Sequence, residues 1–264
     1  MPKIKPRFIK IHGTLNGICM YPLNGVYIAR KSSAPTKEQI KNDPRFATVK
    51  ANTQEFGGAS ILSKAICTGL QHNVQSFKDS YFTSRLSGVC RKIIQKGSGG
   101  PGQREAHLLN HKQALLSFQL HKNYIFNQIF TAEPAILIYP ERNLITVTIP
   151  KSTPNNLKYY PKSATHFTLT AAISLISAHN WHPESQKYHP KHPETNGLGA
   201  TITTEPLLCK IEHQNIILEL KNDYYSQPQG AATTVWLGIT FGQKENNQFI
   251  PLQTARAMEC IGIY

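Results

Sequence analysis

The sequence is poor in acidic side chains. Asp and Glu together number only 15 among 264 residues, against 29 Lys and Arg, so the formal net charge is +14. Charged residues of both signs make up 17% of the chain, below the usual share of about a quarter. Neutral polar groups must therefore form much of the surface. A pair of carboxylates for acid–base hydrolysis is also hard to find in such a sequence.

Paired cysteines are absent. The five cysteines are odd in number, lie far apart and form no C-x-x-C motif, which excludes both a disulfide framework and a cysteine-based zinc site. We expect reduced, buried thiols in a reducing compartment. They are Cys19, Cys67, Cys90, Cys209 and Cys260.

Long apolar runs are also missing. No segment approaches the roughly 18 apolar residues that a membrane-spanning helix requires. The basic start, Met1–Arg7, is followed by Lys10 rather than by the apolar stretch of a signal peptide. We therefore expect a cytoplasmic protein that has no membrane contact.

Catalytic signatures are missing too. The glycine-rich segment Gly97–Gly102 is followed by Gln103 and Arg104, where a phosphate-binding loop has Gly-Lys-Ser/Thr. No G-x-S-x-G elbow occurs. The sequence predicts a non-catalytic protein without a cofactor. It also predicts a flexible loop at Gly97–Gly102, with Arg104 contacting an anion at the start of the next helix.

Positive charge is present, and it is concentrated. Residues 1–130 hold 19 Lys and Arg against 5 Asp and Glu, whereas residues 131–264 hold 10 of each. This asymmetry predicts a basic module that binds nucleic acid or an acidic protein by contacting phosphates or carboxylates without reading sequence. The candidate residues are Arg30, Lys31, Lys37, Lys41, Arg45, Lys50, Arg91, Lys92, Lys96 and Arg104.

An alternative function follows from the same charge. Positive charge also keeps a self-associating surface soluble. The chain is then a self-assembling structural subunit, a homo-oligomer or filament built through its β-rich second half. We therefore keep two hypotheses, a polyanion-binding protein and an assembly subunit.

The first half predicts a β-hairpin region followed by helices. Asn16-Gly17 and Asn24-Gly25 supply the positive φ angles of tight hairpin turns. The strands that they join are expected at Phe8–Ile11, Ile18–Tyr21 and Val26–Ile28.

Apolar residues at helical spacing predict helices at residues 53–70 and 82–93, with Thr53 as a possible first cap. A third amphipathic segment is expected at residues 105–117. Gly57-Gly58 weakens the first helix unless another backbone packs closely against it.

The second half predicts short strands. Ile136–Ile138 and Leu144–Ile149 flank a turn and indicate a hairpin. Further β-like segments separated by Pro- and Asn-rich turns are typical of a sandwich of immunoglobulin-like size. The expected fold class is α+β, with a hairpin and two or three helices in a domain of residues 1–130. An all-β immunoglobulin-like sandwich follows in residues 131–264.

One histidine-rich segment is a candidate metal site. Two pairs at i,i+3 spacing offer four imidazole nitrogens to zinc or copper. Three prolines prevent the helix that normally aims such pairs, so a solvated loop between strands is the alternative. The four residues are His179, His182, His189 and His192.

Several short motifs follow one another along most of the chain. They include Gly13-Thr14, Asn24-Gly25, Asn42–Phe46, Glu55–Gly57, Gly102–Arg104, Thr146–Pro150, His166-Phe167 and Leu237–Ile239. In this order they resemble a group of uncharacterised two-part proteins from Bacteroidota bacteria. That group has no established activity, so the resemblance implies a bacterial source and the two-part layout, and it implies no site residue.

Overall fold

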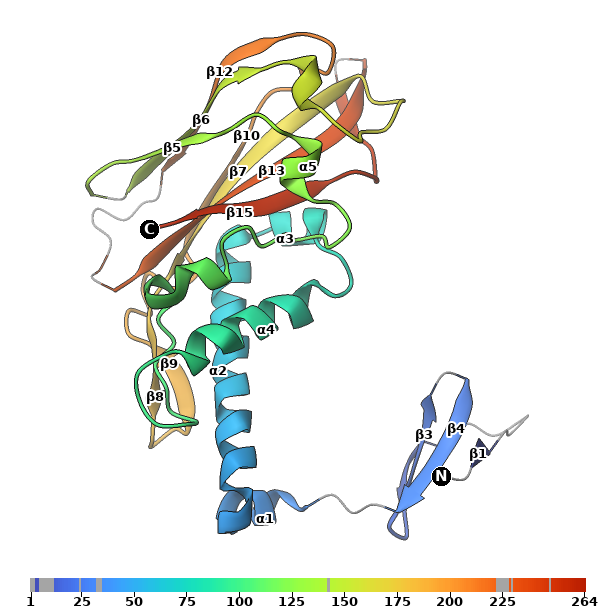
Figure 1. The fold of residues 1–264 in the computed structure, drawn as a ribbon, viewed down its shortest axis with the longest axis vertical. Coiled ribbons are helices and arrows are strands. Elements are labelled where there is room, and N and C mark those ends of the chain that lie inside the picture. Colours follow the sequence, from blue (N-terminus) through green and yellow to red (C-terminus); the bar gives the residue numbers. More distant parts are fainter. Residues whose placement is uncertain are drawn as a thin grey trace. The chain divides into compact units, whose positions relative to one another are not determined.

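The chain forms two compact units, Met1–Lys50 and Ala51–Tyr264; the boundary expected from the charge distribution lies at residue 130. Figure 1 shows the elements of both units. The computed structural model describes residues 3–4, 12–23, 25–31, 35–141, 143–221, 228, 230–246 and 248–264.

The smaller unit contains a four-stranded antiparallel sheet. Asn16 and Gly17 have φ angles of 46° and 74°, so the predicted tight turn joins the second and third strands. The strand expected at Phe8–Ile11 lies outside the described residues. The strand order is β1 (Lys3–Ile4), β4 (Val26–Lys31), β3 (Ile18–Leu23), β2 (Gly13–Leu15), and α1 (Lys37–Asn42) and the 3-10 helix η1 (Pro44–Phe46) follow.

The larger unit is built around a six-stranded antiparallel sheet. Figure 1 shows helices on one face of this sheet and a second, three-stranded sheet over the other. The main sheet runs β10 (Gly199–Thr203), β7 (His166–Ile176), β13 (Ala232–Glu245), β14 (Gln248–Pro251), with β11 (Leu207–Leu208) on β7 and β15 (Ala257–Ile263) on β13.

The three-stranded sheet contains the hairpin that the sequence predicts, because β5 (Ala135–Ile138) pairs with β6 (Leu144–Ser152). β12 (His213–Lys221) pairs with the other edge of β6. A separate hairpin joins β8 (His179–His182) to β9 (Lys187–Pro190).

The helices of the larger unit come mainly from the first half of the sequence. Twelve residues, 96–107, separate α4 from the 3-10 helix η2, and the glycine-rich segment lies among them. No described helix is long and apolar enough to cross a membrane. The helices are α2 (Ala47–Leu70), α3 (Asn73–Phe77), α4 (Phe82–Gln95), α5 (Phe126–Ile129), and the 3-10 helices η2 (Leu108–Ala114) and η3 (Pro154–Asn156).

Two hydrophobic cores lie on opposite faces of the main sheet. Alternate residues of β7 point to opposite sides, so Ala171 and Ile173 enter the core shared with the smaller sheet, whereas Ala172 and Ile176 enter the core shared with the helices. Strands buried on both faces carry nearly continuous apolar sequence. On the face of β7 that carries Ala172, the residues Thr168, Thr170 and Ser174 are polar, yet all three are buried. The partial alternation in β7 therefore does not mark a solvent-facing side.

Helix α2 approaches the β8–β9 hairpin closely. A Cβ added to Gly58 would lie 2.7 Å from the Tyr188 ring of β9, whereas one added to Gly57 would meet nothing within 4 Å. The close neighbour of Gly58 is therefore an aromatic side chain rather than the backbone that the sequence led us to expect.

The predicted fold class is wrong. The structure is mixed, 28% helical and 38% strand in several small antiparallel sheets, and it has no helical half followed by an all-β sandwich. Helices α2 to α4 bury their apolar faces against the main sheet in one core. The strand pattern of the second half could not show that helices from the first half cover one face of that sheet.

Individual helices fit the predictions unevenly. α4 lies where it was expected, but α2 begins at Ala47, six residues before Thr53. The third segment is a short, kinked 3-10 helix, because His111 leaves helical geometry with φ −140° and ψ 38°.

Candidate anion-binding cleft

A cleft of about 600 Å³ lies in the larger unit between the C-terminal part of α4 and η2. Sites for small ligands have volumes of roughly 300 to 1,000 Å³. The cleft is lined by Lys92, Gln95, Lys96, Leu109, Asn110, His111, Lys112, Gln113 and Ala114.

The charge of this cleft is entirely positive. Its lining includes three lysines and a histidine and contains no Asp or Glu. Lys92 of α4 and Lys96, the C-cap of that helix, are four residues apart and so lie on one side of the helix end. Lys112 comes from η2. All three lysines are exposed. A concave surface with charge of one sign concentrates ions of the opposite sign.

His111 fixes the geometry of the cleft. Its Nε2 lies 2.9 Å from the backbone oxygen of Lys96. Because that oxygen accepts, the ring donates from Nε2. The kink at His111 and this hydrogen bond hold η2 against the end of α4, and this places Lys112 beside the two helical lysines.

A purely structural role explains part of this arrangement. Lysines in the last turn of a helix stabilise its dipole, and Lys92 is the basic residue in the last turn of α4. That role accounts for neither Lys112, which lies on another element, nor the absence of carboxylates from the lining. The cleft is therefore more than a capped helix end.

Four of the ten basic residues predicted from the sequence have partners within the protein. Arg104 pairs with Glu55 at 3.0 Å, and Arg45 pairs with Asp43 at 2.7 Å. The hydrogen bonds from Arg45 lower the pKa of Asp43. The other two contacts are Arg91 Nη2 to Asn52 Oδ1 at 3.1 Å and Lys50 Nζ to Lys41 O at 3.3 Å.

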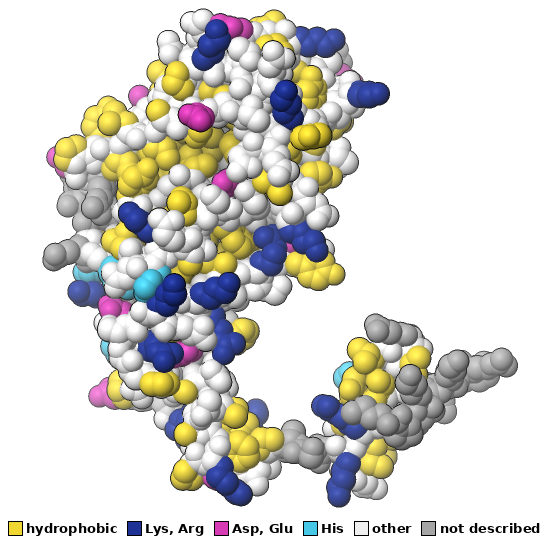
Figure 2. Space-filling view, viewed as in Figure 1, with side chains coloured by type: hydrophobic (Ala, Val, Ile, Leu, Met, Phe, Trp, Pro, Cys, Tyr) yellow, Lys and Arg dark blue, Asp and Glu magenta, His cyan; other side chains and the backbone are white. Residues whose placement is uncertain are grey.

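The remaining predicted residues are exposed. Lys92 and Lys96 line the cleft, and Figure 2 shows Lys and Arg side chains spread over the visible face of the helical part of the larger unit. In the smaller unit, the guanidinium of Arg30 lies 5.6 Å from the centre of the Tyr21 ring. Arg30, Lys31, Lys37 and Lys41 are all solvent-exposed in that unit.

The glycine-rich segment has a defined structure. The backbone N–H of Gly102 donates to Glu55 Oε1 at 2.9 Å, and Glu105 N donates to Ser98 O at 2.8 Å. Arg104 contacts the buried Glu55 rather than an anion at a helix start. These contacts differ from the sequence prediction, in which Gly97–Gly102 is a flexible loop and Arg104 contacts an anion.

The four predicted metal-binding histidines have different environments. His179 is fully buried, and burial lowers its pKa to about 4. The rings of His182 and His189 lie 4.9 Å apart, whereas His192 Nδ1 lies 3.4 Å from Glu194 Oε1. Within the described part of the chain, no group of three or more His, Cys, Asp or Glu residues is placed to hold a metal ion.

Sequence reasoning missed two residues of the cleft, His111 and Lys112. Their contact with α4 depends on the turn of the chain through the glycine-rich segment, which no local pattern encodes. A lysine next to a histidine on an amphipathic segment gives no sign of a site.

Comparisons with known proteins do not add to this picture. Neither a protein-family model, nor a curated protein, nor a solved structure matches the chain. The resemblance to a group of Bacteroidota proteins stays a prediction.

Proposed function

We propose that this is a non-catalytic binding protein that holds a polyanion in the Lys92–Lys96–Lys112 cleft and on the basic surface of its smaller unit. The observation that carries the proposal is the cleft itself, which brings together three lysines and His111 without a carboxylate. Lysines from two separate elements converge there.

The charge of the smaller unit supports the proposal. Residues 1–50 contain ten Lys and Arg and two Asp and Glu. One of those acids, Asp43, is engaged by Arg45. Positive charge at this density attracts a polyanion from a distance and strengthens its binding at low salt.

Nucleic acid is the polyanion that these features favour. Lysine binds phosphate as a point charge without geometric selectivity, and contacts to phosphates carry affinity rather than sequence readout. The cleft lacks arginine, the residue that most often reads guanine bases. We therefore expect binding that is strong at low salt and indifferent to sequence.

The test is fluorescence anisotropy of labelled DNA and RNA with the full chain over a range of salt concentrations. A triple variant, Lys92→Ala, Lys96→Ala and Lys112→Ala, should weaken binding about tenfold or more at about 0.1 M salt. The slope of log affinity against log salt should fall by about 2 to 3.

A matched control keeps the same change of net charge. Lys158, Lys162 and Lys187 are exposed residues of the neutral second half, and replacing all three by Ala should leave the affinity nearly unchanged. Equal losses of affinity in both triple variants would show that binding depends on net charge alone. That result would contradict the proposed role of the cleft. Binding to polyglutamate with none to nucleic acid would indicate an acidic protein as the partner.

Self-assembly is the second candidate, and exposed apolar side chains favour it. Leu137 of β5 is 58% exposed and Ile217 of β12 is 54% exposed, both on the three-stranded sheet of the larger unit. Light scattering after size exclusion separates the two functions. A large species that is free of nucleic acid and unchanged by salt would support assembly and contradict polyanion binding.

A further inference from the structure

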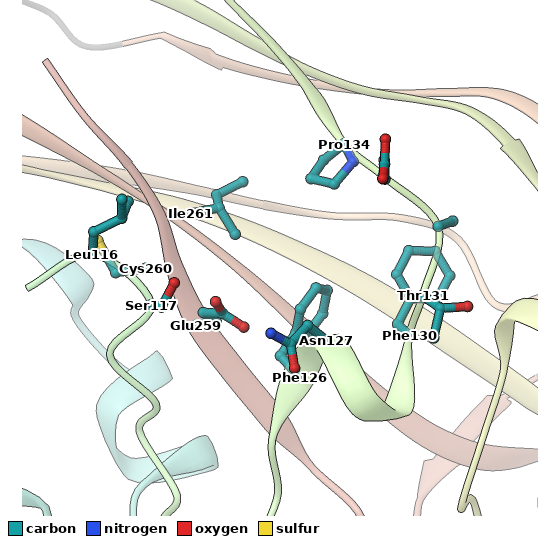
Figure 3. A pocket seen from close by; sticks show the side chains of 12 residues that line it. Leu116, Ser117, Phe126, Asn127, Phe130, Thr131, Pro134, Glu259, Cys260 and Ile261 are labelled. Atoms are coloured by element: carbon teal, nitrogen blue, oxygen red, sulfur yellow. The ribbon is translucent and has the colours of Figure 1, made fainter. Parts of the chain in front are cut away.

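A second pocket, of about 520 Å³, lies beside β15 in the larger unit. Figure 3 shows the side chains around it. They come from β15, from the segment before α5, from α5 itself and from the chain that follows it. The lining residues are Leu116, Ser117, Phe126, Asn127, Phe130, Thr131, Ala132, Glu133, Pro134, Glu259, Cys260 and Ile261.

Backbone hydrogen bonds hold the walls of this pocket in place. Ser117 N donates to Cys260 O at 2.9 Å, and Cys260 N donates to Phe118 O at 3.0 Å, so this segment lies along the free edge of β15. The start of α5 is tied to the same segment, because Phe126 N donates to the side-chain oxygen of Gln119 at 3.0 Å. The pocket is therefore a fixed feature of the fold.

Glu259 occupies a position in β15 where an apolar residue is expected. Successive residues of a strand point to opposite faces. Ala257 and Ile261, two residues on either side, pack in the core between the two sheets, and Glu259 lies opposite Leu237 of that core in the pairing with β13. Its exposed fraction is only 5%.

One oxygen of the Glu259 carboxylate has no hydrogen-bond partner among the described residues. This atom, Oε2, is buried. A carboxylate oxygen that is buried without a donor is strongly disfavoured relative to one in water, and native proteins rarely leave such groups unsatisfied. A donor supplied by a bound molecule would remove this cost.

The chemistry of the lining defines that molecule. The pocket contains two carboxylates, Glu259 and Glu133, and no Lys, Arg or His. In Figure 3 the Glu259 side chain extends from β15 toward Phe126 and Asn127 of α5. Phe126 and Phe130, whose ring centres are 5.8 Å apart, provide an apolar aromatic wall. A cationic group with an apolar body matches both features.

We infer that this pocket binds a small organic amine, whose ammonium group donates to the Glu259 carboxylate while its apolar part packs against Phe126 and Phe130. The site is distinct from the basic cleft, and its ligand has the opposite charge. The inference therefore stands or falls independently of polyanion binding.

The test is isothermal titration of the full chain with three probes of one shape. They are 2-phenylethylamine, the neutral 2-phenylethanol and the anionic 3-phenylpropanoate, and butylamine and tryptamine extend the amine series. We expect saturable binding of 2-phenylethylamine, at least about tenfold tighter than that of the alcohol. The carboxylate probe should not bind.

Variants assign the binding to Glu259. Glu259→Gln keeps the shape of the side chain and should remove the preference for amine over alcohol. Glu205 is exposed and does not line the pocket, so Glu205→Gln is the matched control and should change the affinity less than about threefold. The triple lysine variant of the basic cleft should bind the amine as the wild type does.

Three results would overturn the inference. They are the absence of saturable binding by any amine up to about 10 mM, equal affinity for the amine and the alcohol, and unchanged amine preference in Glu259→Gln. The comparison of amine with alcohol uses the wild-type protein, so it decides the question even where Glu259→Gln fails to fold.

Discussion

The Nη1 atom of Arg104 lies 3.0 Å from Oε1 of Glu55, whose side chain is only 3% exposed. The same oxygen accepts the backbone N–H of Gly102, and the Tyr188 hydroxyl donates to Gly102 O at 3.3 Å. Burial, together with the negative charge of Glu55, raises the pKa of Tyr188 to about 12, so the phenol keeps its proton as a donor. These contacts fasten the glycine-rich segment to α2 and to β9.

Replacing Arg104 by Ala should destabilise the larger unit. The change leaves the buried Glu55 carboxylate without its cationic partner, and we expect a loss of about 2 to 4 kcal/mol in the free energy of unfolding. Urea denaturation at neutral pH measures this loss. Lys92→Ala is the control, since Lys92 is exposed and should change stability by no more than about 0.5 kcal/mol. Equal stability of the two variants would contradict the structural role of Arg104.

Two adjacent glycines of α2 should respond in opposite directions to alanine. Gly58→Ala places a methyl group against the Tyr188 ring, and this overpacking should cost about 1 to 3 kcal/mol. Gly57 is exposed with open space around it, so Gly57→Ala should gain about 0.5 to 1 kcal/mol from helix propensity. Thermal melting of both variants tests the pair. A stabilising Gly58→Ala would show that α2 and β9 are less closely packed than described.

Asp79→Asn should weaken the larger unit at neutral pH. Asp79 accepts from Lys122 N at 2.7 Å, from Tyr81 N at 2.8 Å and from Arg85 Nη2 at 3.0 Å. Burial raises the pKa of this carboxyl, but these hydrogen bonds and the nearby positive charges outweigh burial and lower the pKa below 3.8. Loss of this charge in Asp79→Asn should lower the free energy of unfolding by about 2 kcal/mol.

The pH dependence of this effect follows from the sign of the shift. A lowered folded-state pKa stabilises the protein above the ordinary pKa, and the contribution disappears as pH falls through the folded value. The difference in the free energy of unfolding between wild type and Asp79→Asn should therefore be complete at pH 7 and should shrink below pH 3.8. Glu245→Gln, which changes an exposed carboxylate at the end of β13, should show no such gap. A constant gap at every pH would contradict the assignment.

His179 should make stability fall in weakly acidic solution. Burial is the main cause of its low pKa, about 4, and the nearby His189 adds to it. The unfolded chain binds a proton near pH 6.5, so stability is full above that pH and falls by up to about 3 kcal/mol toward pH 4.

The variant His179→Asn removes this titration and should flatten the decline between pH 6.5 and 4. Urea denaturation across that range measures the slope. The exposed His182 provides the control, because His182→Asn should leave the wild-type slope unchanged. Parallel curves for wild type and His179→Asn would rule out the role of His179.

Local patterns in the sequence predicted several elements. The turn at Asn16-Gly17, the helix Phe82–Gln95 and the hairpin of β5 with β6 follow from turn chemistry and from apolar spacing. These features depend on interactions between residues that are close in sequence. The concentration of positive charge in residues 1–130 is likewise a property of the sequence alone.

The architecture and the sites depended on tertiary contacts. The strand β7 could not reveal that helices cover one face of its sheet. Thr168, Thr170 and Ser174 lie on one face as in a strand that is half exposed, yet all three are buried. The sequence placed Arg104 among the anion-binding candidates. Its pairing with Glu55, 49 residues away, makes it a structural residue instead.

The sequence by itself determined the charge, the turns and the local helices and strands of this protein. Only the tertiary structure brought Lys112 to Lys92 and Lys96. Only the strand register placed Glu259 in an apolar core position, where its Oε2 has no hydrogen-bond partner among the described residues. The physical reason is the same in both cases. Binding sites form where segments distant in sequence meet, and the packing that joins them is set by the whole fold.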